Sequence, residues 1–145
     1  MYKKIRKKIK IIKKKKSFPN ILIPVHFGGQ PTDQKEIHSL SKKYGFDIIE
    51  DASHSLGSKH LGEKVGSCKW SDVTVFSFQA VKNLPTADSG MICFQNKDYD
   101  QLARKMSWLG IDKDTFSRTN TKGTYKWDYD VPTLGYKYHG NSIMA

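Results

Sequence analysis

Residues 32–51, TDQKEIHSLSKKYGFDIIED, predict a helix that is followed directly by a β-strand. Thr32 or Asp33 can cap the start of the helix, and Gly45 suits its end. Between these limits apolar residues recur at helical spacing, at Ile37, Leu40 and Tyr44. Apart from Asp47, residues 46–51 are apolar until they reach two carboxylates, as expected of a buried strand that ends at a polar edge.

Strand patterns on both sides extend this unit into a sheet. Residues 21–27 form a mostly apolar run, which Pro24 weakens as a strand because proline cannot donate to a ladder. A strand, a helix and a strand within so few residues make a βαβ unit, whose strands are parallel. Further elements are predicted downstream, namely strands at 72–78 and 90–94 and a helix from Asp98 or Asp100 to Gly110. The fold class is therefore α/β with a mostly parallel sheet.

The other segments lack a clear period. Residues 52–70 are punctuated by glycine, and residues 111–134 are polar and long for a loop. A helix is predicted to begin at Asn141, shortly before the sequence stops at Ala145, and so short a helix cannot stand alone. We therefore expect the sequence to be a fragment of a longer protein.

The charge is concentrated at the start of the chain. The 145 residues contain 25 basic and 14 acidic side chains, a net charge of +11. Residues 1–16 hold ten of the basic residues and no acidic one, so the rest is nearly neutral. With Ile5, Ile9 and Ile12 on one face, this segment could form a basic helix on an anionic membrane or nucleic acid. We favour a solvated low-complexity tail over residues 1–20, because the stripe is short and has no aromatic anchor.

Composition excludes several classes of protein. A hydrophobic fraction of 37% and an aromatic fraction of 12% exclude a wholly disordered chain. No apolar run approaches the ~18 residues of a membrane span. Cys68 and Cys93 are too few for a disulfide framework, and we expect them to be buried thiols. The lysines interrupt any secretory signal, so we expect a cytoplasmic protein.

Two chemically useful residues follow neighbouring strands. Asp51 ends the strand at 46–51, and Lys82 comes four residues after the strand at 72–78. Ligands bind beyond the carboxyl ends of parallel strands, so both side chains are expected at one crevice. They could form a simple ion pair. The same residues also meet the requirements of pyridoxal phosphate. This cofactor needs a lysine for a Schiff base, an acid for its pyridinium nitrogen and a hydroxyl, here that of Ser77, for its phosphate.

The residues around this crevice resemble the DegT/StrS family of nucleotide-sugar aminotransferases. Residues 49–58, IEDASHSLGS, are similar to its "EDAAHALGA" signature, and residues 75–83, VFSFQAVKN, to its "FSFHATKN" lysine motif. Three shorter matches keep the same order, namely VHFGG at 25–29, DSGMI at 88–92 and GYKYH at 135–139. The resemblance covers about residues 21–145.

The resemblance implies a three-layer fold type I large domain and a homodimer with active sites between its subunits. It implies transfer of an amino group, usually from glutamate, to a keto-sugar linked to a nucleotide, with pyridoxal 5'-phosphate as cofactor. Lys82 would bind the cofactor covalently and move the proton, Asp51 would pair with the pyridine nitrogen, and Ser77 would bind the phosphate. His54 would lie against the ring or its phenolic oxygen. Lys137, His139 and Asn141 are weaker candidates for the neighbouring subunit's phosphate.

The sequence also departs from the family pattern. Asp88 and Ser89 replace the glutamate and first glycine of "EGG". We expect the amino-terminal part of the large domain and the carboxy-terminal small domain to be missing, with residues 21–145 a partial large domain.

Other functions remain as alternatives. A truncated fragment without independent activity is the main one, because catalysis depends on positioning. A hydrolase built on Ser77, His54 and Asp51 lacks a Gly-x-Ser-x-Gly elbow. A metal site at His26, His54, His60 and Asp51 lacks tight ligand spacing. Nucleic-acid binding by the tail is the least favoured interpretation, and the affinity of such binding would fall steeply as the salt concentration rises.

Overall fold

The computed structural model describes residues 5, 7, 19–112 and 130–141, in two compact units. The first unit extends to Gln95, and the second begins at Asn96. Each unit is described separately below.

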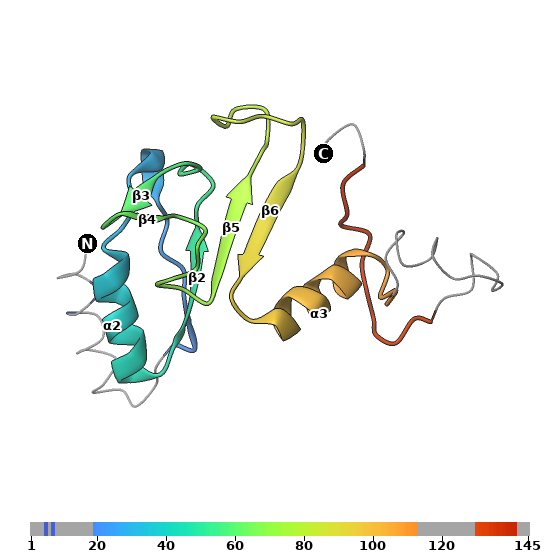
Figure 1. The fold of residues 1–145 in the computed structure, drawn as a ribbon, viewed down its shortest axis with the longest axis horizontal. Helices are drawn as coiled ribbons and strands as arrows, with labels where there is room; N and C mark the ends of the chain where they lie inside the picture. Colours follow the sequence, from blue (N-terminus) through green and yellow to red (C-terminus); the bar gives the residue numbers. More distant parts are fainter. Residues whose placement is uncertain (1–4, 6, 8–18, 113–129, 142–145) are drawn as a thin grey trace. The chain divides into compact units, whose positions relative to one another are not determined.

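A four-stranded sheet forms the centre of the first unit (Figure 1). Its strands lie in the order β1 (Ile21–Leu22), β2 (Asp47–Asp51), β5 (Val73–Ser77) and β6 (Gly90–Phe94). The first three are mutually parallel, and β6 runs antiparallel to β5. The mostly parallel α/β sheet predicted from the sequence is confirmed.

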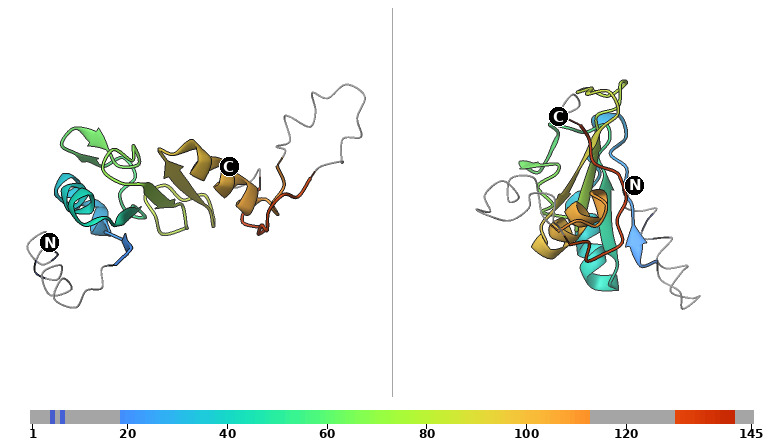
Figure 2. Two further views of the ribbon diagram at one scale, coloured as in Figure 1. Left: turned by 90° about the horizontal axis from the view of Figure 1, so that it is seen from below. Right: turned by 90° about the vertical axis from the view of Figure 1, so that its right-hand side faces the viewer.

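Helix α2 (Gln34–Tyr44) packs on one face of this sheet, as Figures 1 and 2 show. Its end is set by Gly45, whose φ of 71° is left-handed. The apolar stripe of α2 meets the alternate apolar residues of β2 in a buried cluster of Ile37, Leu40, Phe46 and Ile48. Because strand side chains alternate, Ile48 and Glu50 face α2, whereas Ile49 and Asp51 face the other side.

The first strand is much shorter than the predicted run of 21–27. Regular pairing stops after Leu22, and only an isolated bridge between Val25 and Asp51 continues it. Pro24 has no N–H to donate, although its carbonyl accepts from the Asp51 N–H at 3.0 Å. The chain then turns through a short 3-10 helix, η1 (Phe27–Gly29), before α2.

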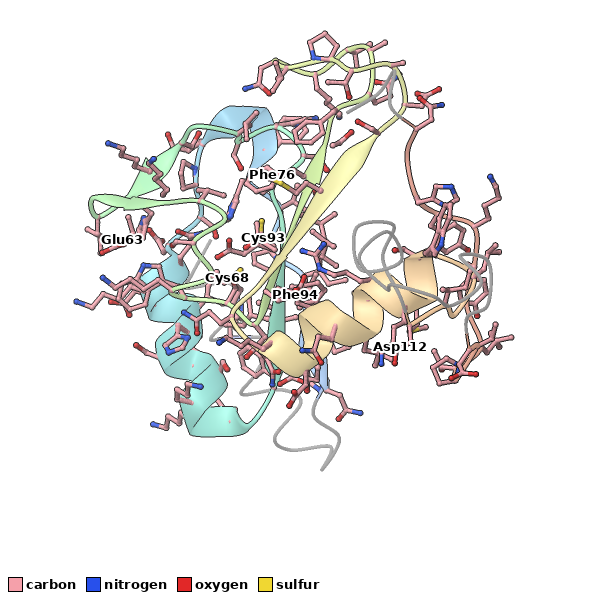
Figure 3. The ribbon with its side chains drawn as sticks, turned by 45° about the vertical axis from the view of Figure 1, so that its right-hand side comes forward. Glu63, Cys68, Phe76, Cys93, Phe94 and Asp112 are labelled. Carbon is pink, nitrogen blue, oxygen red and sulfur yellow. The ribbon has the colours of Figure 1, made fainter. Side chains whose placement is uncertain are left out.

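Residues 52–70, predicted to be irregular, contain a small hairpin of β3 (Lys59–His60) and β4 (Glu63–Lys64). The segment that follows packs Val65 against Ala52 and Phe76 in a second apolar cluster. Cys68 is buried and Cys93 half-buried, and the Cys68 thiol donates to the Cys93 carbonyl at 3.3 Å (Figure 3). Burial raises the pKa of both thiols above the ordinary value.

The second unit contains helix α3 (Lys97–Ser107). The predicted cap at Asp98 or Asp100 is wrong. Asn96 is the cap, and its side-chain oxygen accepts from the N–H groups of Asp98 at 2.8 Å and Tyr99 at 3.3 Å. Asn96 takes this role because its backbone is extended. The two aspartates lie inside the first turn, where their negative charge interacts favourably with the helix dipole.

Several sequence predictions fall mainly outside the described residues. These are most of the loop at 111–134, the helix beginning at Asn141, and the tail apart from Ile5 and Lys7. Ile5 is half-buried against the cluster under α2. Within the part of the chain that the structure describes, no helix is long and apolar enough to cross a membrane.

Candidate functional site

Asp51 lies at the carboxyl end of β2, on the face of the sheet away from α2. Its backbone is fixed on both sides, because its N–H donates to the Pro24 carbonyl and its carbonyl accepts from the His26 N–H, each at 3.0 Å. The chain leaves the strand with the Ala52 N–H donating to the Val75 carbonyl at 2.8 Å. The strand therefore presents Asp51 at the edge where ligands of parallel sheets bind.

The Asp51 carboxylate is stabilised in its charged form. Hydrogen bonding from the Ser53 side chain is the main cause of a lowered Asp51 pKa, it acts against the opposing effect of partial burial, and the Ser53 backbone adds to it. The Ser53 backbone N–H donates to Oδ1 at 3.1 Å. Positive charge on the neighbouring His54 and Lys82 side chains lowers the pKa further. The structure thus brings Asp51, His54 and Lys82 together at one edge of the sheet.

Lys82 is held in the turn that follows β5. Its N–H donates to the Gln79 carbonyl at 2.9 Å, and its side chain is half-buried. The next residue, Asn83, donates from Nδ2 to the Leu56 carbonyl at 3.2 Å. This hydrogen bond connects the turn that contains Lys82 to the loop that follows Asp51, so it links the segments that carry the two candidate residues.

Ser77 ends β5 on the same face as Asp51. Asp51 pairs in register with Val75, and Ser77 lies two residues further along that strand. Strand spacing and rise place the Cα atoms of Asp51 and Ser77 about 8 Å apart. The Ser77 hydroxyl accepts from the Gln79 N–H at 3.3 Å, which leaves its own proton available to a ligand oxygen.

His54 is exposed in the loop after Asp51. Its Nδ1 accepts the Gly28 N–H at 3.3 Å, and the Phe27 ring meets it edge-on at a centroid distance of 5.6 Å. Because a backbone N–H only donates, the neutral ring carries its proton on Nε2. His54 therefore offers a hydrogen-bond donor at Nε2.

The remaining candidates belong to the second unit. Asn141 is exposed there, and its assignment to the site stays a prediction. Lys137 pairs with Trp108 in an isolated bridge, and the His139 ring lies against the Trp108 ring. His139 is thus a packing residue within its own unit.

Sequence reasoning missed three contributors to the site, namely Ser53, Gly28 and Asn83. Each lies inside a stretch that resembles the family, yet no residue pattern specifies its contact: Ser53 acts on Asp51 through its side chain and its N–H, Gly28 through its N–H, and Asn83 through its side-chain amide. The described residues contain no group of three or more side chains arranged to hold a metal ion.

Comparison with known proteins gives one consistent result. The family model for DegT/DnrJ/EryC1/StrS aminotransferases matches residues 3–145, so the match extends into the lysine-rich segment. The uncharacterized protein MJ1066 of Methanocaldococcus jannaschii is 36% identical over 124 residues, which are 86% of this chain and 31% of that protein. The spore coat polysaccharide biosynthesis protein SpsC of Bacillus subtilis is 34% identical over the same shares.

A solved structure agrees with these relatives. The PLP-form of Spr1654 from Streptococcus pneumoniae superposes with a TM-score of 0.66 at 27% identity, covering 86% of this chain and 34% of that one. The chain thus spans about a third of the length of the relatives it matches. From the match over nearly its whole length, the chain belongs to the DegT/DnrJ/EryC1/StrS aminotransferase family.

Proposed function

We propose that this chain is the pyridoxal-phosphate-binding part of an aminotransferase that moves an amino group onto a nucleotide-linked keto-sugar. The observation that carries the proposal is the convergence of the charged Asp51 and Lys82 at the ends of adjacent parallel strands, in a member of this family. Because the chain spans about 31% of its relatives, the activity of the whole enzyme is inferred.

The donor set fits the cofactor. Asp51 remains a carboxylate because Ser53 donates to it, and a carboxylate can hold a proton on a pyridine nitrogen. The Ser77 hydroxyl, on the same face, can donate to a phosphate oxygen. The Nε2–H of His54 can donate to a phenolic oxygen at the ring.

Lys82 is the residue that we expect to react. Its amine lies close enough to Asp51 to influence that carboxylate, and it is half-buried in a turn tied down by Asn83. When bound, pyridoxal phosphate supplies a ring that accepts the electrons left by a broken Cα–H bond. Lys82 would hold the cofactor covalently and, once its amine is free again, would carry the proton to and from the substrate carbon, while Asp51 would keep the ring nitrogen protonated.

The proposed substrate class is based on similarity to a relative of this chain. A relative is named for spore coat polysaccharide biosynthesis, which supports an amino sugar destined for a polysaccharide. We further propose glutamate as the amino donor, a cytoplasmic location and a homodimer for the whole enzyme, on the family resemblance of residues 21–145.

Reductive labelling tests the proposal directly. The chain is incubated with pyridoxal phosphate and reduced with borohydride, and the added mass is located by peptide mapping. We expect the label at Lys82 and its loss in Lys82→Ala, while Lys59→Ala, which removes an exposed lysine of the β3–β4 hairpin, keeps it. Label spread over surface lysines, or no label, would refute the proposal for this chain.

A further inference from the structure

The 3-10 turn η1, Phe27–Gly29, contacts His54 at three points. The Phe27 ring meets the imidazole at 63°, and the Gly28 N–H donates to Nδ1. Gly29 lies so close to the His54 carbonyl that a Cβ would be 3.0 Å from that oxygen, and its φ of +82° also favours glycine. The turn therefore fixes both the place of the His54 ring and the nitrogen that carries its proton.

This turn is anchored by His26, whose side chain is fully buried. The Gly29 N–H donates to the His26 carbonyl at 3.2 Å, and the His26 N–H donates to the Asp51 carbonyl at 3.0 Å. The His26 Nδ1 accepts the Thr32 N–H at 3.2 Å. The other ring nitrogen, Nε2, lies 3.2 Å from the Gln34 side-chain amide nitrogen, so both nitrogens of the buried ring are held by neighbours.

Nε2 of His26 faces Glu50, 3.6 Å from Oε2. Glu50 is 2% exposed and lies on the α2 side of β2, opposite to Asp51. Its two oxygens also accept from the Gln34 amide at 2.6 Å and from the Thr74 hydroxyl at 3.0 Å. The buried carboxylate thus accepts one hydrogen bond from α2 and one from β5, and the Gln34 amide nitrogen connects it to the His26 ring.

We propose that Glu50 and His26 are positioning residues for His54. Glu50 fixes the orientation of His26 through the Gln34 amide, and His26 fixes η1. The turn then holds Nδ1 of His54, so that Nε2 presents its proton to the ligand. The proposal rests on the proposed function only in that the ligand of His54 is pyridoxal phosphate.

The test uses the 145-residue chain without cofactor. Long-range ¹H–¹⁵N NMR of the His54 ring reports which nitrogen is protonated. We expect the Nε2–H tautomer in the natural sequence and a mixture of both tautomers in Glu50→Gln. Glu63→Gln, which changes a surface carboxylate of the hairpin, should leave the His54 signals unchanged. Circular dichroism establishes that each variant is folded.

Two further variants keep the test decisive. If Glu50→Gln does not fold, Thr74→Val replaces it, because it removes one donor of the same carboxylate and keeps the side-chain shape. Phe27→Ala removes the ring that contacts His54. Because the Phe27 side chain is 78% exposed, this substitution should not prevent folding. Each folded variant should shift His54 toward mixed tautomers, and unchanged His54 signals in any of them overturn the proposal.

A binding measurement separates the two proposals. We expect Glu50→Gln to weaken pyridoxal phosphate binding roughly 10-fold, as loss of an outer partner does at other sites. If Lys82 takes no label but the His54 tautomer follows Glu50, the proposed function fails and the positioning role stands. If Lys82 is labelled and the His54 tautomer is unchanged in Glu50→Gln, the positioning role is refuted and the proposed function stands.

Discussion

Two buried threonines offer a matched test of the network around Glu50. Thr74 is fully buried, and its hydroxyl donates to Oε2 of Glu50 at 3.0 Å. Thr32 is 8% exposed, and its hydroxyl is buried without a hydrogen-bond partner. Replacement of either threonine by valine keeps the branched shape and exchanges the hydroxyl for a methyl group. The two substitutions therefore differ in whether a hydrogen bond is lost.

The expected effects have different sizes. Thr74→Val removes the hydrogen bond to the buried Glu50 side chain and also the contacts of the same hydroxyl with Ser71 and Cys68, a loss of about 1.5–3 kcal/mol in the free energy of unfolding. Thr32→Val removes a hydroxyl that was already unsatisfied, so the free energy of unfolding should stay within about 0.5 kcal/mol or rise. The Thr32 backbone N–H that serves His26 is unaffected.

Urea denaturation followed by circular dichroism measures this difference. With an m value of about 2 kcal/mol per M, Thr74→Val should lower the urea midpoint by about 1 M relative to the unmodified chain. Thr32→Val should leave the midpoint where it was. Equal losses in the two variants, or a larger loss in Thr32→Val, would show that the carboxylate does not depend on its donors.

Three further predictions concern backbone geometry, helix capping and pH. Gly66→Ala should destabilise the chain by more than about 2 kcal/mol in urea denaturation, because a Cβ there would lie 2.7 Å from a buried aromatic ring at a φ of +93°; Gly45→Ala, at a φ of +71° in open space, should cost only about 1 kcal/mol. Asn96→Ala should cost about 1 kcal/mol and speed amide exchange in the first turn of α3, since the cap accepts two N–H groups. Because the folded pKa of Asp51 is lowered, its charged form stabilises the fold above the unfolded pKa, and that contribution disappears as the pH falls through the folded pKa. Ser53→Ala should therefore raise the pKa of Asp51 in a carboxyl-carbon NMR titration, and an unchanged midpoint would contradict the role of Ser53.

Much of the first unit could be predicted from local patterns. The 3.6-residue spacing of Ile37 and Leu40 and the glycine that follows Tyr44 were enough to place α2. The run of apolar residues before Asp51 placed β2 in the same way. Prediction was poorer at β1, because an apolar run alone does not show where a proline ends the ladder.

Capping shows a second limit of local patterns. Asn96, Asp98 and Asp100 are all suitable cap residues, so the sequence alone left the start of α3 open to several positions. The choice of Asn96 depends on its extended backbone, with a φ of −79° and a ψ of 118°.

The sequence by itself determined that Asp51 ends one strand and that Lys82 follows another, because the length and polarity of each strand are written in consecutive residues. Only the tertiary structure decided how these residues are supported. The contact of Gly28 with His54 joins residues 26 positions apart, and that of Asn83 with Leu56 joins residues 27 positions apart. Such pairs meet because the order and direction of the strands bring them to one edge, and neither property is encoded in a local pattern.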